Sequence, residues 1–217
     1  MTSTARTTDA STTNATTDAR TTVHLAVYDT LADWETGHAT AWLARAGYTV
    51  RTVGTTAGEP VTTIAGIRIV PDLSLADLTP EDSALLILPG AEQYDEGDEL
   101  APFTAKARAF LDAGVPVAAI CGATAGLAKE GLLDDRPHTS AASFYLAATG
   151  YKGGERYVEA DAVRDGDLIT AGPTEPVAFA REIFARLGAY EGKRDAWYRL
   201  FHHSDPAAFA ELNADED

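Results

Sequence analysis

The sequence of 217 residues contains a single cysteine, Cys121, so no disulfide bond can form within the chain. This usage is typical of proteins from a reducing compartment such as the cytoplasm. No apolar run approaches the ~20 residues that a membrane span needs, and the N-terminus lacks the apolar core of a signal peptide. We therefore expect a soluble cytoplasmic protein.

Basic residues are also scarce, because 17 Lys and Arg stand against 33 Asp and Glu and give a formal net charge of -16. Such a charge repels nucleic acid and anionic membranes, so neither is expected as a partner. Two explanations of the acidity stay open. One is adaptation to high internal salt, where screening makes self-repulsion tolerable, and the other is the ordinary acidity of a protein from a high-GC genome.

Motifs for cofactors are absent from the sequence. It has no glycine-rich phosphate-binding loop, and no cofactor is predicted. His202 and His203 are adjacent but have no cysteine or third histidine near them in the chain, so no metal site is predicted.

The composition divides the chain into three parts. Residues 1–21 are nearly all small or polar and cannot bury enough apolar surface to offset the entropy of ordering, which predicts a disordered tail. Residues 22–188 carry the regular apolar patterns of one domain. Residues 189–217 are rich in aromatic side chains and end in acids, which predicts a helical extension with an acidic tail.

Within the domain, apolar patterns of strands and helices alternate. Strands are expected at residues 23–28, 48–53, 84–88, 115–120, 157–158, 162–163 and 168–170, a small hairpin or a pair of edge strands at 61–70, and helices at 34–46, 100–113, 124–130, 143–148 and 174–187. This order predicts an α/β layered fold with a mostly parallel sheet, in which the first strand, helix and strand form a right-handed crossover. In such sheets ligands bind beyond the carboxyl ends of the strands.

Cys121 lies where a buried apolar strand ends and a helix begins, followed by the small residues Gly122 and Ala123. A side chain at such a corner faces the helix N-terminus, whose unpaired N–H groups stabilise an anion. The position therefore predicts a nucleophilic thiol with a lowered pKa. The alternative is a small buried apolar residue, which is the common role of a lone cysteine.

Two other side chains are candidates for a role beside the cysteine. Glu35 follows the first strand, and if that strand neighbours the cysteine strand a protonated Glu35 could donate a hydrogen bond to the sulfur. The alternative is a carboxylate that stabilises a helix N-terminus. His138 could be the base that activates the thiol, or only a solvated residue in a polar loop.

Backbone N–H groups at strand-to-helix corners can stabilise the anion that forms when a nucleophile attacks a carbonyl. Gly90, Ala91 and Gly122 lie at such corners and are candidate oxyanion donors. The alternative is ordinary turn chemistry, for which Pro-Gly is common.

Several stretches together resemble the ThiJ/PfpI family of the class I glutamine-amidotransferase-like superfamily. Residues 118–128 (AAICGATAGLA) and 131–136 (GLLDDR) are similar to its nucleophile elbow. Glu35 lies in a segment similar to its acidic loop, residues 86–90 (LILPG) to its oxyanion strand, and residues 169–174 (ITAGPT) to its final strand. The branch most similar is that of the type 1 glutamine amidotransferases.

The resemblance implies a flavodoxin-like three-layer sandwich that forms a homodimer and acts on a small-molecule substrate. It implies Cys121 as nucleophile, Glu35 as the carboxyl that holds a thiolate, and Gly122 and Ala91 as oxyanion donors. Many catalytic members have a histidine about twenty residues after the cysteine, where this chain has Ala141.

Position 122 is a glycine, whereas the peptidase-like branch has a histidine after the cysteine, so protease activity is not expected. The leading hypothesis is a cysteine-dependent enzyme for a small carbonyl or amide compound, of the amidase/hydrolase or glyoxalase/deglycase type. The alternative is an oxidation-sensing or chaperone-like stress protein that uses the same cysteine without turnover.

Overall fold

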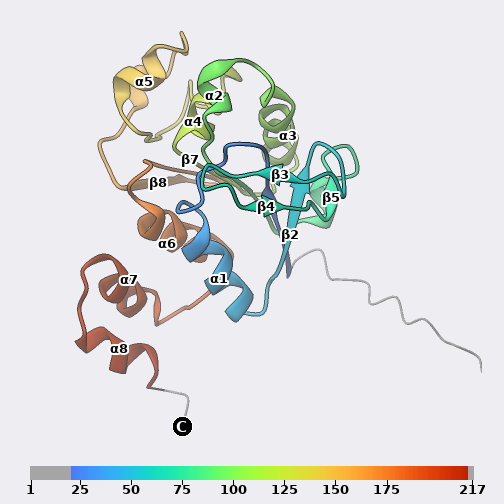
Figure 1. Ribbon diagram of the computed structural model, residues 1–217. Helices are drawn as coiled ribbons and strands as arrows, with labels where there is room; N and C mark the ends of the chain where they lie inside the picture. The colour runs from blue at the N-terminus through green and yellow to red at the C-terminus, as the bar shows by residue number, and fades with distance from the viewer. Residues whose placement is uncertain (1–20, 215–217) are drawn as a thin grey trace, which may run out of the picture.

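The computed structural model describes residues 21–214, so nearly all of the predicted N-terminal tail lies outside the described residues. A seven-stranded sheet has the order β5-β2-β1-β6-β7-β9-β8 (Figure 1). Its strands are β1 (Thr22–Ala26), β2 (Thr49–Gly54), β5 (Leu73–Ser74), β6 (Leu85–Leu88), β7 (Val117–Ile120), β8 (Ala162–Asp165) and β9 (Leu168–Ala171). All neighbours are parallel except β8 and β9, which form an antiparallel edge.

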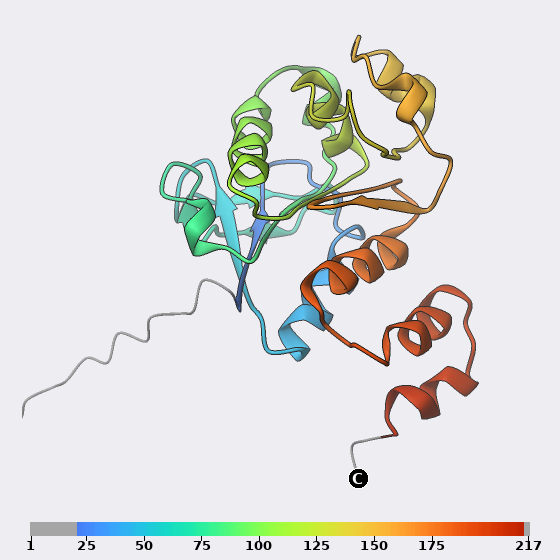
Figure 2. The same cartoon turned by 180° about the vertical axis from the view of Figure 1, so that it is seen from behind.

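Helices cover both faces of this sheet. The helices of the described residues are α1 (Gly37–Arg45), α2 (Gln93–Glu96), α3 (Ala101–Asp112), α4 (Gly122–Lys129), α5 (Ser143–Ala147), α6 (Pro176–Leu187), α7 (Arg194–His202) and α8 (Ala207–Leu212). Helices α3 and α4 pack on one face, and α1 and α6 on the other, as both views show (Figures 1 and 2). The α/β sandwich with a mostly parallel sheet is confirmed.

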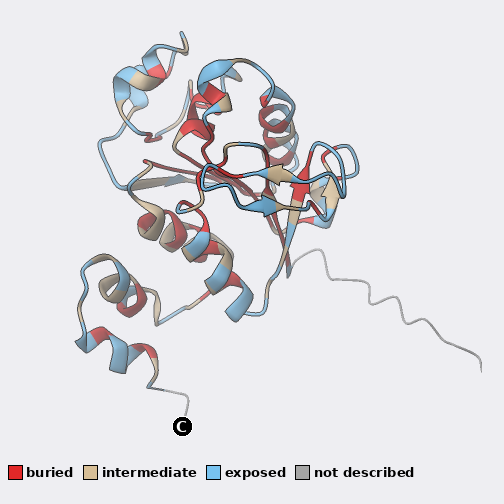
Figure 3. Ribbon diagram, viewed as in Figure 1, coloured by how far each residue is buried: buried red, intermediate tan, exposed pale blue. Residues whose placement is uncertain are grey.

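The centre of the sheet is its most buried part. Every residue of β6 and of β7 is buried, and Figure 3 shows these strands in red between the two helix layers. Strands that are covered by helices on both faces are apolar along their whole length, which is why their sequences are continuous apolar runs. The rigid ends of β6 and β7 hold the corners that carry Gly90 and Cys121.

Some local predictions differ from the structure. Helix α1 begins at Gly37 and not at residue 34, because residues 33–36 form turns. Residues 157–158 form no strand, since Tyr157 makes only an isolated bridge to His138. The short elements α2 and β5 were not predicted, because four and two residues are too few to show a period. The predicted hairpin is present as β3 (Val61–Thr62) and β4 (Arg68–Ile69).

The helices after α6 are attached to the sandwich by an aromatic cluster. Trp197 of α7 is fully buried, with ring centroids 4.9 Å from Phe184, 5.9 Å from Trp42 and 5.2 Å from Phe201. These rings come from α6, α1 and α7, so one side chain joins three helices. The contacts with Phe184 and Trp42 are edge-to-face, and such contacts add to the stabilisation that burial alone gives.

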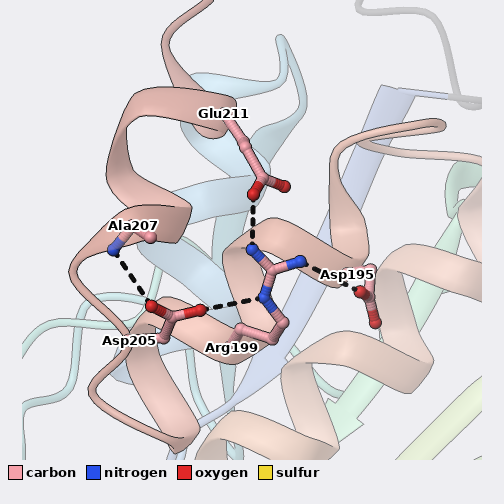
Figure 4. A network of polar contacts seen from close by, with 5 residues as sticks. All are labelled: Asp195, Arg199, Asp205, Ala207 and Glu211. Carbon is pink, nitrogen blue, oxygen red and sulfur yellow. Dashed lines mark hydrogen bonds and ion pairs between the residues drawn. The ribbon is translucent and has the colours of Figure 1, made fainter.

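Arg199 of α7 contacts three carboxylates, and one of them, Glu211, lies on α8 (Figure 4). Its guanidinium nitrogens lie 3.1 Å from Asp205, 2.7 Å from Glu211 and 3.6 Å from Asp195. Asp205 in turn accepts a hydrogen bond of 3.0 Å from the backbone N–H of Ala207, at the start of α8. None of the helices in residues 21–214 is long and apolar enough to cross a membrane.

Candidate active site

Cys121 lies in a strained turn between β7 and α4. Its φ is 56° and its ψ is -126°, a conformation that non-glycine residues rarely adopt. Hydrogen bonds hold the strained residue in place: its N–H donates to Ala171 O at 3.0 Å, and its carbonyl accepts from Thr124 N at 3.0 Å. Such strain persists where surrounding contacts fix it, and it is common at functional sites.

The side chain of Thr124, in the first turn of α4, also holds this turn in place. Thr124 Oγ1 lies 2.5 Å from Cys121 O and 2.6 Å from Ser140 Oγ, so it connects the turn to the segment that follows α4. Charge-neutral hydrogen bonds of this kind restrict the rotation of the turn and fix the direction of the thiol.

Glu35 reaches Cys121 across Gly90. The Glu35 side chain is fully buried, and its Oε2 accepts a hydrogen bond of 2.5 Å from the N–H of Gly90. A Cβ on Gly90 would stand 3.0 Å from Glu35 Oε1 and 3.0 Å from Cys121 Sγ. Oε1 has no hydrogen-bond partner among the described residues, and the Cys121 sulfur lies beside it across Gly90.

The strand before Glu35 does not neighbour the cysteine strand, although the contact was expected only if it did. Strand β1, which precedes Glu35, does not neighbour β7, because β6 lies between them. The carboxyl nevertheless meets the sulfur, since Gly90, in the corner that follows β6, has no side chain and leaves the space between them open.

Burial raises the pKa of Glu35 from 4.5 to about 7, against the hydrogen bonds from Gly90 and Cys121, which lower it. Burial and the negative charge of Glu35 raise the pKa of Cys121 from 9.0 to about 12, although the Gly122 N–H hydrogen bonds the sulfur. The predicted lowering of the thiol pKa is therefore wrong in direction. As pH rises through 7, the carboxyl loses its proton and the pair keeps one, which lies on the sulfur of Cys121 in the more populated form.

A cleft of about 290 Å³ opens above this pair. The candidates Glu35, Gly90, Ala91, Cys121 and Gly122 all line it. The N–H of Gly90 is occupied by Glu35 and the N–H of Gly122 by the sulfur, so these two amides fix the pair in its present form. The structure thus brings together the candidates that lie on the first loop, the oxyanion corner and the elbow.

His138 lies outside this cleft. It is fully buried, with Nδ1 2.8 Å from Arg136 O and Nε2 3.0 Å from Tyr151 Oη. Burial lowers its pKa. The solvated-loop alternative is therefore wrong, and the predicted approach of His138 to the thiol is absent. Ala141, at the position of the family histidine, lines the cleft instead.

Comparison with known proteins assigns the chain to a family. The model of the DJ-1/PfpI family matches residues 21–186. The chain belongs to the DJ-1/PfpI family. The ThiJ/PfpI resemblance seen in the sequence is confirmed, and with it the flavodoxin-like α/β fold.

Relatives in the DJ-1/PfpI family carry the names of enzymes. The Bacillus subtilis protein named "Uncharacterized protease YoaZ" is 38% identical over 201 residues, which cover 88% of this chain and 95% of the relative. Escherichia coli "Protein/nucleic acid deglycase 2" is 30% identical over 149 residues, 67% of this chain and 85% of the relative. A crystal structure of a thiJ/pfpI family protein from Bacillus anthracis has 36% identity and a TM-score of 0.83, covering 89% of this chain and 96% of that one.

Three further side chains of this DJ-1/PfpI cleft were not singled out in the sequence. Tyr145 Oη donates a hydrogen bond of 2.8 Å to Asp95 Oδ1, and both residues line the cleft. Trp34, which is 53% exposed, also lines it and donates from Nε1 to Pro173 O at 3.0 Å. The contact of Tyr145 with Asp95 joins α5 to α2, two short helices far apart in the chain, so no sequence spacing could have indicated it.

His202 has carboxylates beside it, although the sequence shows none nearby. Within residues 21–214, one ligating atom each of Asp161, Glu175 and His202 lies within 4.8 Å of the others. His202 Nε2 is 3.5 Å from Asp161 Oδ2, and its ring stacks on Tyr198. His203, by contrast, is not part of this group.

Proposed function

We propose that this chain is a cysteine-dependent enzyme that acts on a small carbonyl or amide compound. The observation that carries the proposal is the contact of the buried Glu35 carboxyl with the Cys121 thiol, at a strained turn in an open cleft. A buried acid with a raised pKa beside a nucleophile is an arrangement that active sites use to move protons near neutral pH.

The chemistry follows from the proton shared by this pair. Above pH 7 one proton remains, and when it lies on Glu35 the sulfur of Cys121 is a thiolate. The thiolate attacks the substrate carbonyl carbon: a bond from sulfur to carbon forms, and the electrons of the carbonyl bond move to oxygen. Ala91 and Gly122 line the cleft, and their backbone amides are the proposed donors to that oxyanion; the Gly122 N–H becomes available once the sulfur has bonded to carbon and lost its negative charge.

Glu35 then returns its proton to the leaving group or to the oxygen. A substrate bonded to the sulfur would bring both atoms near the carboxyl, because Glu35 and Cys121 line the same cleft. Relatives named as a protease and as a deglycase support an enzyme and leave the reaction type open. The family resemblance further implies a homodimer, whose mass light scattering would measure.

The test is a screen of small amides, aldehydes and nitriles with the wild-type chain, followed by C121S and C121A on each substrate found. We expect both variants to lose turnover, because the only thiol of the chain is removed. Circular dichroism checks that the variants fold as the wild type does. Turnover retained in C121A would overturn the proposal.

A second candidate function is oxidation sensing. Glu35 Oε1 has no nitrogen or oxygen partner among the described residues and faces the sulfur, so a protonated Glu35 would donate to the oxygen of a sulfenic or sulfinic acid. Peroxide oxidises the thiolate to a sulfenic acid, with the second peroxide oxygen leaving as hydroxide. Mass spectrometry after mild peroxide treatment tests this, and an unmodified Cys121 would exclude it.

A further inference from the structure

The charged side chains around the cleft are all of one sign. Glu35, Glu92 and Asp95 line it, and no lysine, arginine or histidine is among its described lining residues. Enzymes that bind a carboxylate or phosphate group of the substrate present basic side chains to it. This cleft presents acceptors of hydrogen bonds and negative charge instead.

Tyr145 is part of the same acceptor surface. Its hydroxyl proton points to Asp95 Oδ1, at an oxygen–oxygen distance of 2.8 Å. Burial and the Asp95 carboxylate raise the pKa of Tyr145, so the phenol stays protonated at neutral pH. Because its one proton is used in the hydrogen bond to Asp95, Tyr145 Oη can only accept a hydrogen bond from a ligand. Asp95 itself is exposed and keeps Oδ2 as a further acceptor.

The remaining wall of the cleft is apolar. Trp34 and Ile64 line it with 53% and 45% of their surfaces exposed, which is unusual for large apolar side chains in a concave site. A ligand that covered them would gain from the burial of its own apolar part. The cleft therefore combines an apolar wall, a nucleophile and a side that accepts hydrogen bonds.

We propose that the cleft selects substrates that are uncharged or cationic, carry an N–H or O–H donor for Tyr145 and Asp95, and have no carboxylate or phosphate group. Tyr145 and Asp95, which both line the cleft, bind the substrate directly. This inference rests on the proposed role of Cys121 as the nucleophile, and it narrows the substrate to uncharged or cationic amides and aldehydes that also carry an N–H or O–H group.

Alkylation of Cys121 tests the inference without a known substrate. Iodoacetamide is neutral and carries an amide N–H, whereas iodoacetate is an anion of nearly the same size. With either reagent the thiolate forms a bond to the methylene carbon and iodide leaves. Because the chain has one cysteine, intact mass gives the rate of a single site. Both rates are proportional to the fraction of Cys121 that is thiolate, so their ratio does not depend on it. The same ratio for a small free thiol in the same buffer is the reference.

We expect the ratio of the iodoacetamide rate to the iodoacetate rate in the wild type to exceed that of the free thiol about tenfold or more, since nearby carboxylates repel the anion. D95N should lower the ratio about threefold or more, and Y145F should slow iodoacetamide without a matching loss for iodoacetate. E96Q removes the same charge from the same helix at a residue that does not line the cleft, and should leave the ratio unchanged.

The outcomes separate the two proposals. If Cys121 is alkylated but its ratio equals that of the free thiol, or if D95N and E96Q change the ratio equally, the substrate class is wrong and the nucleophile stands. If neither reagent modifies Cys121 in the folded chain, the proposed function fails, and the substrate class that rests on it fails as well.

Discussion

Glu35 Oε1 and Cys121 Sγ face one another across the bare Cα of Gly90, each 3.0 Å from the point where a Cβ would stand. The strands that precede them are separated by β6, so the contact depends on the glycine at position 90, in the corner that follows β6. This relationship makes the ionisation of the carboxyl and that of the thiol inseparable, and the expected effects of pH follow from it.

The first expectation concerns the stability of E35Q. The pKa of Glu35 in the folded state, about 7, lies above its value of 4.5 in the unfolded chain, so the folded state binds this proton more tightly. Its contribution to stability is complete below pH 4.5 and is lost as the pH rises to 7, by about 3 kcal/mol. Glutamine carries no charge to bury.

The unfolding free energy of E35Q minus that of the wild type should therefore be larger at pH 8 than at pH 4.5, by up to about 3 kcal/mol. Urea unfolding of both proteins at the two pH values measures this. A difference in unfolding free energy that is the same at pH 4.5 and pH 8 would show that the carboxyl is not buried as described.

The second expectation concerns Gly90. An alanine Cβ there would lie 2.8 Å from Cys121 Cβ and 3.0 Å from Glu35 Oε1, so G90A must push the pair apart. We expect the rate of Cys121 alkylation at pH 8 to change at least several-fold and the stability to fall by about 1 to 3 kcal/mol. G37A is the matched control, because a Cβ on Gly37 meets nothing within 4 Å. Equal behaviour of the two variants would contradict the geometry.

The third expectation concerns Trp197, which joins α7 to α6 and α1. Its ring is fully buried, but its Nε1 has no hydrogen-bond partner among the described residues. W197A should lose about 3 to 5 kcal/mol of stability. W197F keeps most of the packing and removes a buried unpaired donor, so it should lose much less. Denaturant unfolding of the two variants checks this, and equal losses would place the indole N–H in an unseen hydrogen bond.

Much of the fold could be predicted because burial leaves a direct mark on the sequence. The strands β6 and β7 are covered on both faces, and their continuous apolar runs followed from that. The corner at Cys121 was visible because small residues follow an apolar strand at once. Elements of two to four residues, such as β5 and α2, could not be predicted, since no period fits in them.

Residues of the candidate site could be predicted where the neighbouring sequence marks the end of a strand. Cys121, Gly122, Gly90 and Ala91 lie at strand ends and could be found from the apolar runs before them. The direction of the thiol pKa could not, because it depends on the burial of Cys121 and on the charge of Glu35, a residue remote in the chain. The sequence likewise gave no sign that His138 would be held away from the sulfur by Tyr151.

The central claim is that Glu35 and Cys121 ionise as one unit with a first pKa near 7. The most direct measurement is the rate of Cys121 alkylation by iodoacetamide from pH 5 to pH 10, followed by intact mass, for the wild type and E35Q. For the wild type we expect a step centred near pH 7 and then a plateau, because the population of the singly protonated pair stops changing.

In E35Q the thiol must ionise alone, and burial holds its pKa above the ordinary value. We expect its rate to show no step near pH 7 and to climb about tenfold per pH unit toward a thiol pKa above 9. Profiles of the same shape in both proteins, or a step near pH 7 that survives in E35Q, would contradict the account.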